Sequence, residues 1–471
     1  MSVLATGSTQ VSEESCRISD EVLEDLLERG VSPAEVGQVH LTNGNALCFN
    51  ETSQPSCCSA AMENVFEDQV EESLRQKLVQ LMTDFEDSIQ NHVDEFDHFV
   101  LFEIHGARRD VVLRLRKTFG ILLSGTLDEV NTMYLNMAEY FSEGVITGEE
   151  IVVSFLESLY TQLTQQLFGR STRRYIGCTL TIMNKTHPNF FTEKLNSLKS
   201  AVARPMLDFR AYSQSLRSIR KVFRRLKQME ITDECKKNII RSTKCPYCRG
   251  LGQNLPPCPL LCTRVFEHCT HFSDGVFFDS LIGYIIAMSP IAQRVGLLDV
   301  LSVPVIISNA VLEFHYFWGR RRLQVEESCG ESLYNSPEAD VPVTEDEEDI
   351  PPSSGYRKFA KTLRTMNVLN NITQTILNHN YFCETSSPFS SPCWNGSHVS
   401  TSTVDHGSLI VASDAPPEIL KEAKVLKRLA AKLRKLSTEN GGSCGSREDK
   451  NDPSISEKGK GASGHTARPI M

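Results

Sequence analysis

Apolar residues recur every three or four positions over most of the chain, which is the spacing of a helix with one buried face. In residues 70–89 the repeat consists of Val70, Leu74, Leu78, Leu81, Phe85 and Ile89. Similar patterns predict helices at about 186–203, 208–230, 274–289, 291–316, 356–380 and 417–437. The sequence has no convincing run of strand alternation, so the pattern predicts an all-α fold.

One predicted helix has a clear start signal, the sequence TGEE at residues 147–150. The Thr147 hydroxyl can accept a hydrogen bond from a backbone N–H of the first turn, and the Glu150 carboxylate can reach back to the N–H of Thr147. The apolar face that follows consists of Ile151, Phe155, Leu159 and Leu163. We therefore expect a helix to begin here.

Three segments lack helical periodicity. Residues 332–354 are acidic and proline-rich, residues 384–416 are rich in Ser, Thr and Pro, and the tail is rich in Gly, Ser and Lys. Such compositions bury little apolar surface and are typical of solvated loops. We expect an irregular N-terminal segment over 1–15, one helical core over 16–437 that includes both loops, and a flexible polar tail over 438–471.

The chain has 471 residues, a net charge of −10 and a pI near 5.7, which disfavours nucleic-acid binding. Residues 217–227 contain a basic run with one aromatic residue, Phe223, rather than the repeated interleaved aromatics used for base stacking, so we interpret it as a solvated helix face. Catalytic and nucleotide-binding motifs such as HExxH and the P-loop are absent. The sequence predicts neither an enzyme nor a bound metal or cofactor.

The cysteine content is high, at fifteen residues, and the number is odd. Cys245 and Cys248 would form one half of a zinc site if His268 and His271, or Cys258 and Cys262, formed the other half. Zinc would leave ten or more scattered cysteines unexplained, whereas scattered single cysteines suit long-range disulfides. Disulfides are therefore favoured, with an intracellular zinc-binding scaffold as the alternative.

The evidence for the cellular compartment is mixed. Four N-glycosylation sequons, at Asn50, Asn184, Asn371 and Asn395, agree with an oxidising environment. Neither a signal peptide nor a GPI-anchor signal is visible, and charged residues and prolines interrupt the most apolar region, residues 276–318, so no membrane-spanning helix is expected. The sequence fits either a cytosolic protein or a secreted protein without its two ends.

The cysteine pattern resembles a known family. Its signature consists of Cys235, Cys245-Pro-Tyr-Cys248-Arg-Gly250, Pro257-Cys258, Cys262 and Cys269, and it is similar to that of the glypicans, the core proteins of cell-surface heparan sulfate proteoglycans. Further similarities are Cys16, Cys48, Cys57-Cys58, the lone Cys178 and Cys329, and Cys393-Trp394-Asn395-Gly396. The resemblance covers roughly residues 16–440. It implies an elongated, disulfide-stapled, single-domain all-α fold with a cysteine-rich lobe.

The resemblance also implies a disulfide pairing, which sequence alone does not determine. The implied bridges are Cys16–Cys57, Cys48–Cys245, Cys58–Cys248, Cys178–Cys329, Cys235–Cys269, Cys258–Cys393 and Cys262–Cys383. Cys444, in the tail, has no partner in this scheme.

Heparan sulfate is attached to serine in Ser-Gly pairs, and the two candidates are Ser354, after an acidic run, and Ser463 in the tail. The resemblance implies a GPI-anchored, extracellular co-receptor that carries heparan sulfate and modulates growth factors and morphogens of the Wnt, Hedgehog, BMP and FGF classes. The alternative within the family is a secreted or shed core protein that acts as a ligand sink without heparan sulfate.

The last predicted helix is basic and amphipathic. Its basic residues, Lys421, Lys424, Lys427, Arg428, Lys432, Arg434 and Lys435, lie opposite Ile419, Ala423, Leu426, Ala430 and Leu433. Such a helix can lie on an anionic membrane or hold a sulfated chain. The simpler interpretation, which we favour, is a helix packed through its apolar stripe with a solvated basic face.

Overall fold

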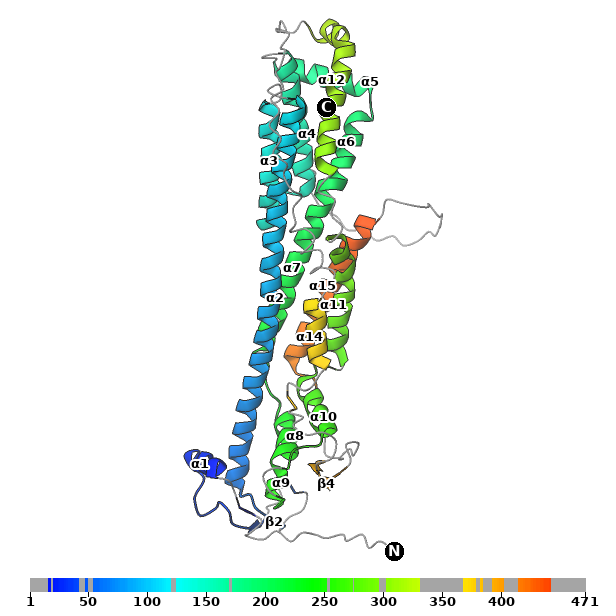
Figure 1. Ribbon diagram of the computed structural model, residues 1–471. Coiled ribbons are helices and arrows are strands. Elements are labelled where there is room, and N and C mark those ends of the chain that lie inside the picture. Colours follow the sequence, from blue (N-terminus) through cyan, green and yellow to red (C-terminus); the bar gives the residue numbers. More distant parts are fainter. Residues whose placement is uncertain are drawn as a thin grey trace, which may run out of the picture. The chain divides into compact units, whose positions relative to one another are not determined.

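The computed structural model is all-α, as predicted (Figure 1). It describes residues 16–17, 20–41, 47–49, 54–119, 124–168, 172–251, 255–273, 275–295, 302–330, 367–377, 382–383, 392–401 and 414–441. The first helices are α1 (Asp20–Glu28), α2 (Ala60–Phe119), α3 (Ser124–Ser142), α4 (Gly148–Phe168), α5 (Arg173–Thr186) and α6 (Phe190–Leu198). A π-helical turn, η3 (Lys199–Ala203), leads into α7 (Arg204–Leu226), α8 (Asp233–Thr243), α9 (Cys245–Cys248) and α10 (Pro259–Thr270). The last helices are α11 (Gly275–Val295), α12 (Ser302–Cys329), α14 (Asn367–Leu377) and α15 (Pro417–Gly441).

Two short antiparallel strand pairs accompany the helices. Strand β1 (His40–Leu41) pairs with β2 (Pro55–Ser56), and β3 (Cys393–Trp394) pairs with β4 (Val399–Ser400). Each strand has two residues, so the strands order local chain segments rather than build a sheet core.

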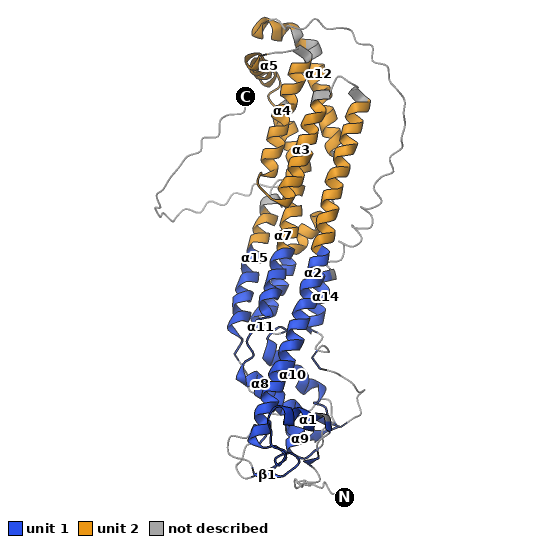
Figure 2. Ribbon diagram, turned by 90° about the vertical axis from the view of Figure 1, so that its left-hand side faces the viewer, with its two compact units in different colours: residues 1–92, 216–287, 366–431 blue, residues 93–215, 288–365, 432–471 orange. Residues whose placement is uncertain are grey.

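The chain groups into two compact units (Figure 2). Unit 1 consists of residues 1–92, 216–287 and 366–431, and unit 2 consists of residues 93–215, 288–365 and 432–471. Helices α2, α7, α11 and α15 contribute residues to both units.

In unit 1, the helix face predicted from the repeat in residues 70–89 is buried. Leu78 is 1% exposed and Ile89 is fully buried, and the Phe85 ring meets Phe223 of α7 edge-on, with centroids 5.3 Å apart. The apolar stripe of α15 is buried too, with Leu426 fully enclosed. Local periodicity thus identified the core positions of both helices.

Unit 2 has an aromatic core. The ring of Phe96 on α2 lies 6.3, 6.0 and 4.8 Å from the rings of Phe141, Phe209 and Tyr212, respectively. Tilted and edge-to-face pairs of this kind add stability beyond the burial of apolar area.

The capping box predicted at the start of α4 is confirmed. The Glu150 carboxylate accepts from the Thr147 N–H at 2.8 Å, and the Thr147 hydroxyl accepts from the Glu150 N–H at 3.2 Å. These bonds satisfy backbone donors that a helix N-terminus otherwise leaves unpaired.

Helix boundaries were predicted less well. The single helix predicted over 291–316 is wrong, because α11 runs through Pro290 to Val295 and α12 begins only at Ser302. Contrary to the sequence-based expectation, α11 is long and apolar enough to cross a membrane by length and composition alone. Its Leu281 and Tyr284 side chains are fully buried in the protein, as expected of a core helix.

Candidate functional site: the cystine lobe and the charged helix faces

The fourteen cysteines of the family pattern form seven disulfides. Unit 1 contains Cys16–Cys57, Cys48–Cys245, Cys58–Cys248, Cys235–Cys269, Cys258–Cys393 and Cys262–Cys383. Cys178–Cys329 joins α5 to α12 in unit 2. These are the pairs that the family resemblance implies. We call the part of unit 1 built from α1, α8–α10 and residues 47–49, 54–58 and 392–401 the cystine lobe.

Helix α9 is the centre of the cystine lobe. Its single turn, with Pro246 at the start, separates Cys245 and Cys248 by three residues, so one short element binds both Cys48 and Cys58. Gly250 follows with φ of +73°, a left-handed conformation that favours glycine and ends the turn. The CPYCRG sequence therefore builds a compact double anchor for the N-terminal segments.

Arg249 joins three segments of the cystine lobe. Its guanidinium donates to the carbonyl oxygen of Cys48 at 2.9 Å and to that of Ser397 at 3.3 Å. It also lies over the rings of Phe49 and Trp394, 5.2 and 5.6 Å from their centroids. Burial lowers the pKa of Arg249 from its usual value. Beyond the motif itself, no sequence pattern indicated this role of Arg249.

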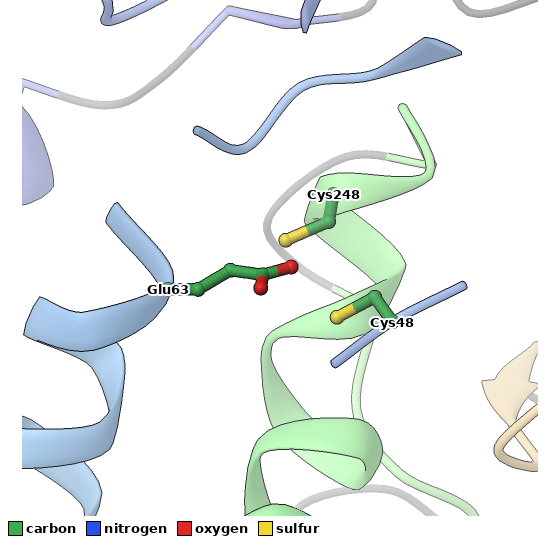
Figure 3. A group of neighbouring side chains, drawn as sticks. All are labelled: Cys48, Glu63 and Cys248. Carbon is green, nitrogen blue, oxygen red and sulfur yellow. The ribbon is translucent and has the colours of Figure 1, made fainter. Parts of the chain in front are cut away.

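Cys48, Glu63 and Cys248 form a group with the spacing of metal ligands (Figure 3). Their potential ligand atoms all lie within 4.8 Å of one another. Both sulfurs, however, belong to disulfides and cannot act as thiolates. The Glu63 carboxylate instead accepts from the backbone N–H of Leu47 at 3.1 Å. Burial raises the pKa of Glu63, and this effect exceeds the opposite effect of the backbone hydrogen bonds. The group is therefore structural.

Disulfide formation also excludes the cysteine ligands of the zinc site that the sequence analysis gave as an alternative. Cys245, Cys248, Cys258 and Cys262 are all in disulfides. His268 and His271 alone cannot complete a four-ligand zinc site.

The basic run of α7 is not simply a solvated face, so that interpretation was wrong for four of its residues. Three cations surround the Glu86 carboxylate: Arg224 with Nε at 2.8 Å, Lys227 at 2.9 Å and Arg220 at 3.2 Å. Burial opposes ionisation of Glu86, but hydrogen bonds and charge from Arg224 and Lys227 prevail and lower its pKa to about 2. We call this group the Glu86 clasp.

A second clasp joins α7 to α15. Both nitrogens of the Arg225 fork lie 2.6 Å from the two carboxylate oxygens of Glu422, whose side chain is 2% exposed. This two-point geometry is the strongest form of a side-chain ion pair.

The basic face of α15 is exposed, as the favoured interpretation predicted. All seven of its predicted basic residues are exposed, while the opposite stripe is buried. The helix ends at Gly441, slightly beyond the predicted 437.

The glycosylation candidates differ in accessibility. Asn184 on α5 and Asn371 on α14 are exposed, whereas Asn395 is 1% exposed. The side-chain oxygen of Asn395 accepts from the N–H groups of Ser397 and His398, at 2.9 and 2.8 Å. The candidates Asn50, Ser354 and Ser463 lie outside the described residues, as do the unpaired Cys444, segment 1–15 and loop 332–354.

A groove of about 370 Å³ opens on the surface of unit 2, between α2 and α3. Phe102, Val112 and Leu113 give it apolar walls, and Arg108 and Arg109 also line it. Phe102 is 54% exposed, which leaves an apolar ring accessible to a ligand.

Comparison with known sequences identifies relatives. A model of the glypican family matches residues 1–465. Glypican-1 of Xenopus tropicalis is 24% identical over 255 residues, which cover 50% of this chain and 45% of the relative. Human glypican-5 is 19% identical over 392 residues, which cover 78% of this chain and 67% of the relative. The chain spans about half the length of the glypican-1 relatives that it matches.

Solved structures share the fold. The crystal structure of the full-length glypican-1 core protein has a TM-score of 0.69 and 18% identity, over 89% of this chain and 98% of that one. Dally-like protein in complex with O-palmitoleoyl serine has a TM-score of 0.63 and 17% identity, over 88% and 97% of the two chains. With a family match over almost its whole length, this chain belongs to the glypican family.

Proposed function

We propose that this chain is a proteoglycan core protein that carries heparan sulfate at the cell surface. In this role it acts as a co-receptor for growth factors and morphogens of the Wnt, Hedgehog, BMP or FGF classes. The sulfated chains would attract basic ligands by charge, and by analogy with DNA their binding should weaken steeply with salt. The helical core would hold those chains and contribute protein contacts of its own.

The observation that carries this proposal is the set of seven disulfides in a glypican fold. Structural disulfides form and persist in the secretory pathway and outside the cell, and they are rare in the cytosol. The bridges therefore support an extracellular protein over an intracellular zinc-binding scaffold. Glypican membership supports the heparan sulfate and co-receptor roles.

The compartment is tested by counting thiols in the denatured, unreduced protein. The scheme predicts one free thiol, Cys444, because the seven bridges use fourteen of the fifteen cysteines. Many free thiols in protein freshly extracted from cells would instead support the zinc scaffold.

The glycan is tested by heparinase digestion of the chain produced in animal cells. Wild type is expected to run as a broad band that collapses on digestion, and the Ser354→Ala/Ser463→Ala variant as a narrow band from the start. Ser124→Ala, at the first residue of α3, is the control and should behave as wild type. Unchanged mobility of wild type on digestion would leave the secreted ligand-sink alternative.

A second candidate function is binding of an acyl group in the groove of unit 2. Two observations favour it: the apolar walls beside Arg108 and Arg109, and the relative solved with O-palmitoleoyl serine. The volume of about 370 Å³ falls within the usual range for small-ligand sites. The arginines would face the polar end of the ligand.

Acyl binding is tested with O-palmitoleoyl serine and the Gly106→Leu variant. Gly106 lines the groove, and a Cβ added there meets no atom within 4 Å, so a larger side chain can occupy the groove without a clash at its first atom. We expect at least a tenfold loss of affinity in this variant. Val305→Ser, which changes an exposed residue of α12 outside the groove lining, is the control. Equal affinity of Gly106→Leu and wild type would exclude the groove.

A further inference from the structure

Four cations of unit 1 lie on one exposed face of α15. Lys421, Lys424, Lys427 and Arg428 are all exposed, and none of them has an ion-pair partner within the described part of the chain. Their spacings of three, four and seven residues place them in neighbouring rows along the helix. From Lys421 to Arg428 the axis rises only about 10 Å, so the positive charge is dense.

The acidic residue nearest these cations in the sequence does not neutralise the face. Glu422 lies between Lys421 and Lys424 in the chain, but its carboxylate is buried and held by both nitrogens of the Arg225 fork. The four cations therefore repel one another across i, i+3 and i, i+4 positions, with no other carboxylate between Lys421 and Arg428 in the chain. The next acidic residue of α15, Glu418, precedes Lys421 by three residues, and its Oε2 atom is buried. This basic face occurs in a chain whose net charge is −10.

The apolar side of α15 is already in use. Ile419, Ala423 and Leu426 are at most 1% exposed and pack inside the protein. A helix that lies on a membrane inserts a broad apolar face among the lipids, whereas here Leu420, 39% exposed, is the one large apolar residue in the described part of α15 that remains exposed. A partner that binds by charge alone and can follow a row of cations fits the face better than a bilayer.

We propose that the face formed by Lys421, Lys424, Lys427 and Arg428 is a non-covalent binding site for sulfated polysaccharide. A linear chain with closely spaced sulfates matches a row of cations, and release of its counterions drives association. The site does not require this chain to carry heparan sulfate itself, so the proposal does not depend on the proposed function.

The test uses a size-defined heparin oligosaccharide and the full chain with Ser354→Ala and Ser463→Ala, which removes the candidate attachment serines. Affinity is measured between 0.05 and about 0.3 M NaCl in this background and after Lys421, Lys424, Lys427 and Arg428 are all changed to Gln. We expect at least a tenfold loss at 0.15 M salt. The slope of log K against log salt should shrink by about 3, at roughly 0.7–0.9 per cation as for nucleic acids.

The matched control removes four exposed cations from four separate parts of the chain. These are Arg17, Lys221 on α7, Lys237 on α8 and Arg264 on α10, each changed to Gln in the same background. Both quadruple variants have the same net charge. The control should lose less than threefold in affinity, and equal losses in the two variants would show an effect of net charge and overturn the proposal.

A footprint on the unsubstituted background avoids any effect of the variants on folding. Bound heparin oligosaccharide should protect Lys421, Lys424 and Lys427 from acetylation, while Lys221 and Lys237 stay reactive. Equal reactivity with and without the oligosaccharide would overturn the proposal. Binding to phosphatidylserine vesicles with no binding to the oligosaccharide would assign the face to membranes and overturn it too.

Discussion

Units 1 and 2 are both helical, but different means hold them together. The cystine lobe of unit 1 contains α1, α8, α9 and α10, with only 9, 11, 4 and 12 residues, and unit 1 carries six disulfides. Unit 2 contains α3, α4 and α12, with 19, 21 and 28 residues, and its described part carries one disulfide. Short helices are marginal on their own, whereas long amphipathic helices are stabilised by packing.

The two units differ in their number of disulfides, whereas both contain buried ion pairs. Unit 1 has the Glu86 clasp and the Arg225–Glu422 pair, and unit 2 has a similar two-point pair, in which Arg294 holds Asp208 at 2.7 and 2.8 Å. Disulfides are concentrated where helices are too short to bury much apolar surface, and cross-links there offset the chain entropy lost on folding.

The largest expected effect is removal of one disulfide from each unit. Cys58–Cys248 and Cys178–Cys329 close loops of similar length, 190 and 151 residues, but only the first is fully buried. We expect Cys58→Ala/Cys248→Ala to lower the free energy of unfolding of unit 1 by about 4–5 kcal/mol, because packing is lost as well. Cys178→Ala/Cys329→Ala should cost unit 2 about 2–3 kcal/mol.

Denaturant unfolding followed by region-resolved hydrogen exchange measures both losses. If the two double variants cost the same, loop length alone would set the contribution of each bridge, and the contrast between the units would fail.

An intermediate effect is expected from Glu86→Gln in the Glu86 clasp. The change leaves three cations without their carboxylate and should destabilise unit 1 by about 2–3 kcal/mol at pH 7, after allowance for their partial exposure. Because the folded pKa of about 2 lies below the ordinary value of 4.5, this stability is complete above pH 4.5. It is lost as the pH falls through about 2, so the difference between variant and wild type should vanish there.

The control for that measurement is Glu230→Gln, an exposed residue, which should change the free energy of unfolding by less than about 0.5 kcal/mol. A difference between Glu86→Gln and wild type that stays constant from pH 5 to pH 2 would contradict the assignment of the low pKa to Glu86.

The smallest effect is expected from Glu63→Gln on α2, whose carboxylate contacts the cystine lobe through Leu47, and this substitution should not destabilise unit 1. Burial raises the pKa of Glu63, so the folded protein holds a proton there more tightly than the unfolded chain does. Above the raised pKa, the buried ionised carboxylate therefore lowers the free energy of unfolding. This destabilisation disappears as the pH falls to 4.5. Glu63→Gln should therefore be neutral or stabilising by up to about 1 kcal/mol at pH 7, with no gain near pH 4.

The pH dependence of the two unfolding free energies checks this prediction. A stability gain from Glu63→Gln that is larger at pH 4 than at pH 7 would show that the carboxylate stabilises the lobe in its ionised form.

Sequence patterns predicted the features that depend on near neighbours. The capping box needs only Thr147 and Glu150, and the two faces of α15 follow from its own periodicity. Boundaries were harder, because Pro290 sits within α11 and the predicted helix over 291–316 spans the end of one helix and the start of another.

Features that join distant segments were not predictable from local patterns. Arg224 and Arg225 find carboxylates 138 and 197 residues away, so their run looked like a solvated face. Cys48 and Cys245 are likewise 197 residues apart, and only the family resemblance supplied their pairing. The burial of Asn395 was also invisible, because a sequon has the same sequence in an open loop and in a closed one.

The buried Asn395 would set an order of events if this sequon is used during biosynthesis. Asn395 follows Cys393 by two residues, and its carboxamide is enclosed by the turn that leads to β4. An oligosaccharide on this nitrogen would not fit the closed turn, so any glycosylation of Asn395 would have to precede formation of the Cys258–Cys393 bridge. The fraction of molecules glycosylated at Asn395 would then report how fast the Cys258–Cys393 bridge forms. Rapid formation would leave Asn395 unmodified, and slow formation would raise the glycosylated fraction.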